Sequence, residues 1–302
     1  MTLGSCFADN MAAELLRAKF RVTANPAGVL FNPASIALML GMFDQATPVS
    51  RQELACDGGR WFDYRFHGSL AALSADEALQ KMNAAVETGH RALREADTVI
   101  ITFGTAWVYT LNATGQTAAN CHKQPQSLFT KRRMSVNEIV AQFGQLLEGV
   151  LKEKSVIFTV SPVRHLADGF DENFLSKATL KLAVAELVAA HENALYFPAY
   201  EIVNDDLRDY RFYADDLVHP SAQAVAYIRE KFFGAALDAE AAVALPKVVK
   251  IVAAAAHRPF NADDPAFVEF CRTNLQRISE LEESVAGLDL SAERRYFAGC
   301  VQ

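Results

Sequence analysis

The chain has 302 residues, of which 51% are hydrophobic and 22% are charged, and its formal net charge is -7. This size and composition are typical of a globular protein with one large α/β domain and an extension, or with two domains. The net negative charge argues against a nucleic-acid partner. The one marked basic run, Lys131-Arg132-Arg133, is short and is interpreted as a solvated turn. No apolar stretch approaches the roughly 18 residues that span a membrane, so we expect no membrane partner.

The cysteines indicate the redox environment. They number five, at positions 6, 56, 121, 271 and 300, and show no Cys-x-x-Cys spacing. Such a set predicts neither a disulfide framework nor a zinc site. The start of the chain shows no basic segment followed by an apolar one, as a secretory signal would. We therefore expect a reducing, cytoplasmic location, although a first strand of only residues 1–3 leaves open a natural start further upstream.

The first third of the chain mixes short strands with amphipathic helices. After the apolar lead, residues 8–20 carry apolar side chains at helical spacing, and residues 21–24 are expected to form a strand. Asn32-Pro33 opens a helix expected to reach residue 43, because proline is tolerated in the first turn. Residues 48–68 are expected to be irregular, and residues 74–96 to form a long helix that begins at the capping box Ser74-Ala-Asp-Glu77.

The middle of the chain predicts a buried sheet. Residues 98–103 and 155–160 are continuous apolar runs, as in strands covered on both faces of a parallel sheet. Between them we expect a hairpin from residues 107–111 and 116–120 and a capped helix over residues 135–152. A helix over residues 173–191, a strand over residues 195–197 and a helix over residues 220–237 follow. This alternation predicts an α/β fold with a mainly parallel sheet between two helical layers, a three-layer α/β/α sandwich.

Residues 238–302 differ in character from the predicted sheet domain, residues 1–237. They are rich in alanine and helical in pattern, with expected interruptions at Pro246 and at residues 257–261. We predict a helical C-terminal extension that packs against its own domain. A separate appendage and a dimer contact are the alternatives.

Gly4-Ser5-Cys6 lies between the first strand and the first helix, a position suited to a nucleophile. Free amides and the dipole at a helix start favour negative charge, so a thiolate on Cys6 would be stabilised there. Ser5 is the alternative nucleophile, but its hydroxyl would depend wholly on a base. An ordinary turn, with Ser5 as N-cap and Cys6 as a small buried side chain, explains the same residues.

Asp216 and His219 stand three residues apart before the helix at residue 220. A carboxylate in that place can fix the tautomer of an imidazole held over a site. A capping carboxylate beside a surface histidine is the plainer interpretation. A nucleophile after the first strand and an acid–base pair late in the chain would nevertheless converge at the carboxyl edge of one sheet, where α/β proteins place their sites.

Other polar residues follow the predicted strands. Arg164 and His165 come after residues 155–160 and are candidates to bind a substrate carboxylate or sugar hydroxyl, or else to pair with the acidic residues 205, 206 and 209. Asn120-Cys121-His122-Lys123 offers a second Cys–His pair, and His122 is a further candidate substrate-binding residue. The spacing of the histidines and cysteines does not demand a metal, so we predict neither a metal nor a cofactor.

Several long motifs resemble one known family. They are Gly4-Ser-Cys-Phe-Ala8, Asn25-Pro-Ala-Gly-Val-Leu-Phe-Asn-Pro33, Gly104-Thr-Ala-Trp-Val-Tyr109, Asn120-Cys-His-Lys123, Ser161-Pro-Val-Arg-His165 and Arg211-Phe-Tyr-Ala-Asp-Asp-Leu-Val-His-Pro220. Over about residues 1–235 the chain is similar to the GSCFA family, a bacterial group related to the SGNH (GDSL-like) hydrolases. The resemblance implies an SGNH hydrolase-like, flavodoxin-like sandwich. It implies no established activity, since the family is named for its motif.

The wider superfamily implies roles for individual positions. Cys6 stands where its serine nucleophile belongs, and Asp216 and His219 match its last block. The resemblance implies that the Gly28 amide donates to the oxyanion. The third block departs from the pattern, because Gly104-Thr105-Ala106-Trp107 lacks the asparagine that completes the oxyanion hole. Two alternatives follow: either Thr105 or Asn120 takes the place of this asparagine as oxyanion donor, or catalysis is weakened or altered.

Two functions follow as expectations. The first is an acyl-ester hydrolase, or esterase, or an acyltransferase with Cys6 or Ser5 as nucleophile, acting on a small-molecule or glycan acyl substrate such as an acylated carbohydrate. The second is a catalytically weak or inactive module that binds a glycan or peptide. Trapping an acyl adduct on Cys6 would separate the two.

Overall fold

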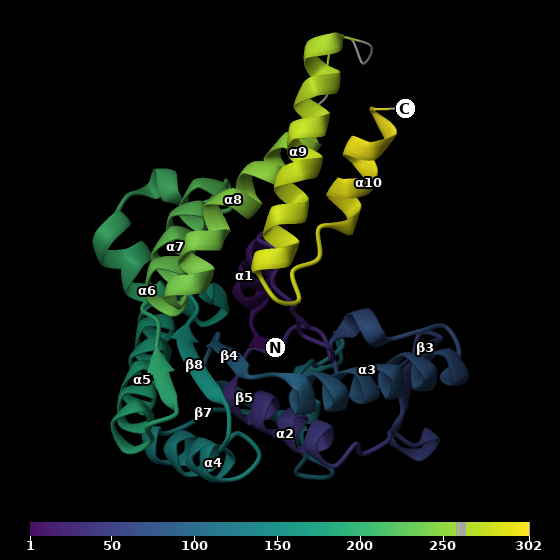
Figure 1. Ribbon diagram of the computed structural model, residues 1–302. Coiled ribbons are helices and arrows are strands. Elements are labelled where there is room, and N and C mark those ends of the chain that lie inside the picture. Colours follow the sequence, from purple (N-terminus) through teal and green to yellow (C-terminus); the bar gives the residue numbers. More distant parts are fainter. Residues whose placement is uncertain (258, 260–263, 302) are drawn as a thin grey trace. The chain divides into compact units, whose positions relative to one another are not determined.

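The computed structural model describes residues 1–257, 259 and 264–301 (Figure 1). Contacts divide the chain into two compact units. The first, which we call the sheet unit, comprises Met1–Asn10 with Thr23–Ile228, and the second, the helical unit, comprises Met11–Val22 with the chain from Arg229 onward. The predicted boundary between residues 237 and 238 stays a prediction.

A four-stranded parallel sheet forms the centre of the sheet unit, in the order β1 (Thr2–Gly4), β4 (Thr98–Phe103), β8 (Ser155–Val160) and β9 (Ala194–Tyr196). The α/β class with helices flanking a parallel sheet is thereby confirmed (Figure 1). Residues 98–103 and 155–160 form strands with the predicted bounds. Alternate side chains of β4 and β8, including Phe103 and Phe158, join the main hydrophobic core.

The strand expected at residues 21–24 is wrong, because only Ala24 pairs, in a single parallel bridge to Thr2. Asn25 follows with a positive φ of 37°, which turns the chain away before more bonds can form. The bridge still extends the strand order beyond β1. The chain therefore passes from one side of β1 to β4 on the other, and such a switch point opens a crevice at the carboxyl ends of the two strands.

The helices lie close to their predicted positions. Their bounds are α1 (Cys6–Arg17), α2 (Pro33–Asp44), α3 (Ala75–Glu95), α4 (Val136–Glu148), α5 (Gly169–Ala190), α6 (Ala199–Glu201), α7 (Ala222–Ala236), α8 (Ala239–Ala256), α9 (Pro265–Ser284) and α10 (Ser291–Gly299). Short helical turns are η1 (Arg51–Glu53), η2 (Gly68–Leu70), η3 (Gln126–Leu128), η4 (Leu166–Asp168), η5 (Ile202–Leu207) and η6 (Tyr210–Phe212). Asn32 caps α2 through the Ser35 amide, and Ser74 caps α3 through the Glu77 amide.

Two small antiparallel sheets complete the sheet unit. β2 (Ala55–Asp57) pairs with β3 (Arg60–Phe62), so the stretch expected to be irregular contains a hairpin. The predicted hairpin of β5 (Trp107–Leu111) and β6 (Thr117–Ala118) is confirmed, with β7 (Phe129–Arg133) on the other edge of β5. The basic run interpreted as a turn therefore belongs to a strand. Lys131 lies over the ring of Trp107 and pairs with Asp168, partners that the local sequence does not reveal.

The helical unit has a core of its own. Val248 and Ile251 of α8 pack with Cys271 and Ile278 of α9 and with Phe297 of α10. The expected interruption at Pro246 is wrong, since α8 continues through this exposed proline. The expected interruption at residues 257–261 lies largely outside the described residues. None of the helices in the described part of the chain combines the length and the apolar character that crossing a membrane requires.

Candidate active site

The junction between β1 and α1 is fixed by close backbone contact. Gly4 has a φ of 136°, and a β-carbon there would lie 2.1 Å from the carbonyl oxygen of Thr102 on β4. The Ser5 amide donates to that same oxygen at 3.2 Å. Only glycine fits this approach. Cys6 is consequently held as the first residue of α1, at the carboxyl end of β1.

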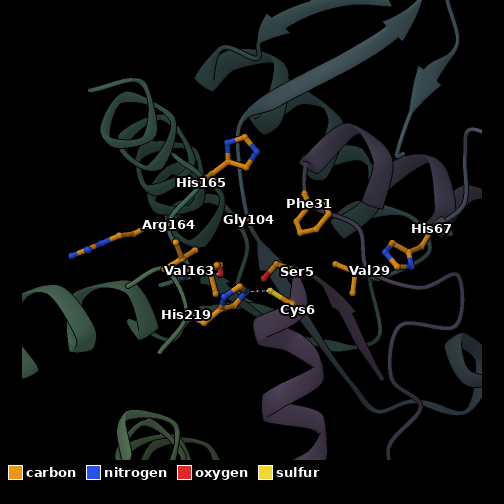
Figure 2. Close-up of a pocket in the computed structure, with 12 residues that line it drawn as sticks. Ser5, Cys6, Val29, Phe31, His67, Gly104, Val163, Arg164, His165 and His219 are labelled. Atoms are coloured by element: carbon orange, nitrogen blue, oxygen red, sulfur yellow. Dashed lines mark hydrogen bonds between the residues drawn. The ribbon is translucent and has the colours of Figure 1, made fainter. Parts of the chain in front are cut away.

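Cys6, His219 and Asp216 form a continuous row of interacting atoms, of which Figure 2 shows the contact between Cys6 and His219. The Cys6 sulfur lies 3.5 Å from His219 Nε2, and His219 Nδ1 lies 2.6 Å from Asp216 Oδ2. The other oxygen of Asp216 accepts the amides of Val218 and His219, each at 2.9 Å. The carboxylate therefore shapes the loop that carries the imidazole, in addition to orienting the ring.

The hydrogen bonds to Asp216 set the charge of the row. The His219 amide, the His219 ring and the Val218 amide together lower the pKa of Asp216 to about 2. Asp216 is thus ionised near neutrality and accepts a hydrogen bond from Nδ1–H of His219. Nε2 then presents a lone pair to the thiol, the tautomer that a general base requires.

The Cys6 thiol is not activated by its helix position alone. Burial raises its pKa and outweighs the amides of Cys6 and Phe7, which lower it, while Asp9 raises it further and Lys177 lowers it. The expected stabilisation at the helix start is present but smaller than the desolvation of the sulfur. A thiol that is protonated at rest must pass its proton to His219.

A cavity of about 370 Å³ opens over this row (Figure 2). Its lining residues are Ser5, Cys6, Val29, Phe31, His67, Gly104, Ser161, Val163, Arg164, His165, Val218 and His219. Valine and phenylalanine side chains give it apolar walls. Five of the predicted site residues line it, namely Ser5, Cys6, Arg164, His165 and His219.

Ser5 reaches the cavity but lacks a base. Its side chain is fully buried, and among the described residues its hydroxyl has no hydrogen-bond partner. His219 contacts Cys6, and the structure records no bond from it to Ser5. The geometry therefore favours sulfur over this hydroxyl.

The amides of Gly28 and Thr105 are already occupied. Gly28 donates to the Asn25 carbonyl at 2.7 Å, and Thr105 donates to the Phe31 carbonyl at 2.9 Å. The Thr105 hydroxyl bonds with that of Ser176 at 3.1 Å. Neither Gly28 nor Thr105 is in the cavity lining, so the structure does not bring them to the sulfur.

Asn120 and His122 lie together away from the cavity lining. Asn120 Oδ1 accepts the His122 amide at 2.7 Å. Nε2 of His122 donates to the carbonyls of Asp63 and Phe66 at 3.1 and 3.2 Å. Burial lowers the pKa of this histidine, which suits a neutral ring that ties a loop together. Among the described residues, no three His, Cys, Asp or Glu side chains are placed to hold a metal ion.

Arg164 and His165 line the cavity but make protein contacts. Arg164 donates to the Leu217 carbonyl at 3.1 Å, lies over the ring of Tyr213, and points away from Cys6 (Figure 2). It therefore clamps the loop that carries His219 to the end of β8. The His165 ring also points away from the sulfur, and its Nδ1 lies 3.7 Å from Asp168. Burial lowers the pKa of His165.

Sequence reasoning missed His67 and Lys177. His67 lines the cavity from a stretch without a regular pattern, and no local signal marks it. Lys177 is 2% exposed and lies on the buried face of α5. A signal for Lys177 exists in the sequence, because it precedes Leu180, Val184 and Leu187 at helical spacing and so falls on an apolar face.

Comparison with known protein families gives matches over both parts of the chain. A model described as the GSCFA family matches residues 1–232. A second, described as GSCFA domain protein, C-terminal domain, matches residues 248–302. Comparison with curated proteins and with solved structures found no match.

Proposed function

The chain belongs to the GSCFA family, and we propose that it is a cysteine-dependent acyl hydrolase or acyltransferase with Cys6 as nucleophile, His219 as base and Asp216 as its orienting partner. One observation carries this proposal. The sulfur, the imidazole and the carboxylate stand in a row with contacts of 3.5 and 2.6 Å, and the first two residues of the row line a cavity.

The first half of the reaction forms a thioester. His219 Nε2 takes the thiol proton as the sulfur attacks the acyl carbonyl carbon, and the carbonyl electron pair moves onto oxygen. When this tetrahedral species collapses, the bond to the leaving oxygen breaks, and that oxygen receives the proton from Nε2. The released product is an alcohol, and the acyl group stays on Cys6.

The second half returns the free enzyme. Water, or an acceptor hydroxyl, gives its proton to Nε2 and attacks the thioester carbonyl. The sulfur leaves as thiolate and regains the proton from the imidazole. With water the product is a carboxylic acid, and with an acceptor hydroxyl it is a new ester.

The amides at the start of α1 support the developing negative charge. Those of Cys6 and Phe7 lower the pKa of the thiol, and we assign them the same role toward the charge that forms in the reaction. We assign His67 as the side-chain donor in place of the missing asparagine. Its Nδ1 is the acceptor for the Ser69 amide at 3.3 Å, which leaves the proton on Nε2.

The parallel strand order supports the proposed relation to the SGNH hydrolases. When the bridge at Ala24 is counted as a strand position, the order across the sheet is Ala24, β1, β4, β8 and β9. The second segment along the chain therefore lies at the edge, next to the first. That order is flavodoxin-like, with the ligand crevice at the switch point beside β1. Bacterial origin and action on acylated carbohydrate belong to this proposal and rest on the family resemblance.

A binding module is the second candidate. It is favoured by the occupied amides of Gly28 and Thr105, which leave the site without two expected oxyanion donors. Such a module would hold a glycan or peptide in the cavity and form no thioester.

The two candidates are separated by intact-protein and peptide mass spectrometry after treatment with an activated short-chain acyl ester. We expect one adduct on Cys6 that is lost in Cys6→Ala and forms more slowly in His219→Ala. Cys56→Ala is the control, because Cys56 is exposed and lies outside the cavity lining. An adduct confined to Ser5 would reassign the nucleophile. Absence of any adduct, with stabilisation by a glycan or peptide, would favour the binding module.

A further inference from the structure

Lys177 is a buried ammonium group without a carboxylate partner among the described residues. Its side chain is fully enclosed. Its Nζ donates to two main-chain oxygens, the carbonyl of Gly104 at 2.6 Å and that of Ser161 at 2.7 Å. A buried cation is costly to desolvate, and proteins usually pair it with a carboxylate. Here two neutral carbonyls take that place.

The two carbonyls belong to the candidate site. Gly104 follows β4 and Ser161 follows β8, and both residues line the cavity over Cys6. The last backbone bond between these two segments runs from the Ser161 amide to the Phe103 carbonyl at 2.8 Å. Lys177 bridges the carboxyl ends of β4 and β8 at this point and so fixes one wall of the cavity.

Lys177 and Cys6 belong to the same site, because Gly104, whose carbonyl Lys177 holds, lies in the cavity lining together with Cys6. The positive charge of Lys177 lowers the pKa of the Cys6 thiol, and a thiolate on Cys6 raises that of Lys177 in return. Other charged groups act on the same sites. Asp9 raises the pKa of Cys6, whose sulfur faces His219, and Lys177 lowers the pKa of His165.

The ring of Tyr200 in α6 lies 5.9 Å from Nζ and adds no charge. Desolvation lowers the pKa of Lys177 to about 7, so the group is protonated on the acid side of neutrality.

We propose that Lys177 is a positioning residue of the Cys6 site, a buried cation that bridges the ends of β4 and β8 and stabilises the negative charge formed on the sulfur. The proposal rests on the proposed role of Cys6 as nucleophile. It explains why a lysine occupies an apolar helix face, where leucine would pack without desolvation cost. It also supplies the positive potential that the buried helix start alone does not provide.

Alkylation of Cys6 tests this proposal without an acyl substrate. The rate of iodoacetamide labelling at Cys6 is followed by peptide mass spectrometry from pH 6 to 9 in wild type, Lys177→Met and Lys177→Gln. Glutamine keeps hydrogen-bond donors for the two carbonyls but removes the charge. We expect both variants to react several-fold more slowly below pH 7, since the loss of the charge raises the pKa of Cys6 and lowers its thiolate fraction.

The difference from wild type should shrink as pH rises, because Lys177 then loses its proton. Lys181→Met is the matched control on the same helix. Lys181 is half-buried, pairs with Glu201 at 2.8 Å and should leave the rate unchanged. A wild-type rate in Lys177→Gln would overturn the proposed role of the charge, and so would a difference that does not vary with pH.

A second measurement uses the unmutated protein, in case the variants do not fold. Cys6 is labelled either with iodoacetate, which leaves a carboxylate, or with iodoacetamide, which leaves a neutral amide of the same size. The lysine that titrates near pH 7 is followed by NMR of ¹³Cε-labelled lysine. We expect a higher pKa with the carboxylate label, and no such difference in Cys6→Ala. Equal titration with both labels would overturn the proposal.

These outcomes are distinct from failure of the proposed function. If no acyl adduct forms but the charges of Lys177 and Cys6 are coupled, the acyl chemistry is wrong and the buried cation still serves the thiol. If the adduct forms without such coupling, the acyl chemistry stands and Lys177 is only a structural bridge.

Discussion

Gly28 and His67 pack so closely that a β-carbon on Gly28 would lie 2.4 Å from the Cβ of His67. Gly28 also has a φ of 77°, which favours glycine. The family resemblance implies an oxyanion amide at Gly28. The contact indicates another reason for glycine, which is to let His67 reach the wall of the cavity.

Gly28→Ala should therefore destabilise the protein more than backbone strain alone. Gly115→Ala is the matched control, since Gly115 has a φ of 71° and open space around it. We expect a loss of about 1 kcal/mol for the control and at least about 1 kcal/mol more for Gly28→Ala. Urea unfolding measures both. Equal losses would show that the approach of His67 imposes no constraint.

His67→Ala should slow acylation of Cys6 by about a hundredfold if its Nε2 proton supports the oxyanion. The comparison is His122→Ala, which removes the donor to the Phe66 carbonyl and one of the two donors to the Asp63 carbonyl, and should lower stability by about 1 to 3 kcal/mol. Stopped-flow measurement with an activated ester separates the two effects. A wild-type acylation rate in His67→Ala would remove His67 from the mechanism.

Arg164→Lys should loosen the loop that carries His219. Lysine cannot reproduce both the bond to the Leu217 carbonyl and the planar stacking over Tyr213, where the guanidinium lies 4.0 Å from the ring centre. We expect faster hydrogen exchange over residues 213–219 in this variant. Arg132→Lys is the control, since Arg132 pairs with Glu138 and is outside the cavity lining. Unchanged exchange in Arg164→Lys would contradict the clamp.

The pKa of Asp216 predicts a stability effect at low pH. Because the folded-state value is about 2 and the ordinary value is 3.8, the ionised carboxylate stabilises the fold above about pH 4, and this contribution is lost as pH falls toward 2. The difference in unfolding free energy between wild type and Asp216→Asn should thus be constant above pH 4 and shrink below it. A difference that is flat down to pH 2 would contradict this assignment.

Local sequence patterns predicted most of the sheet unit. Residues 98–103 and 155–160 form the central strands because continuous apolar runs have few other solutions in a helix-rich chain. Asn32-Pro33 marks the start of α2 because its signal is local. The residues Cys6, His219 and Asp216 could also be chosen as site candidates from the sequence, since each lies at a recognisable junction of strand, loop and helix.

The features that local sequence patterns did not predict depend on contacts between distant segments. The Thr105 amide could serve as an oxyanion donor only if no carbonyl reached it, and that of Phe31 does. The strand expected at residues 21–24 does not form because the chain turns at Asn25. The rise in the Cys6 pKa depends on how much of the fold covers the sulfur, which the position at a helix start does not indicate.

The Phe31 carbonyl accepts the amides of both Gly104 and Thr105, at 2.8 and 2.9 Å. Two hydrogen bonds to one carbonyl oxygen restrict rotation of this peptide, so we expect the Phe31 side of the cavity to be rigid. We expect a bulky ligand to gain room more readily on the side where Arg164 holds the loop through the Leu217 carbonyl. Substitutions meant to admit larger ligands should accordingly begin at Arg164 and leave Phe31 unchanged.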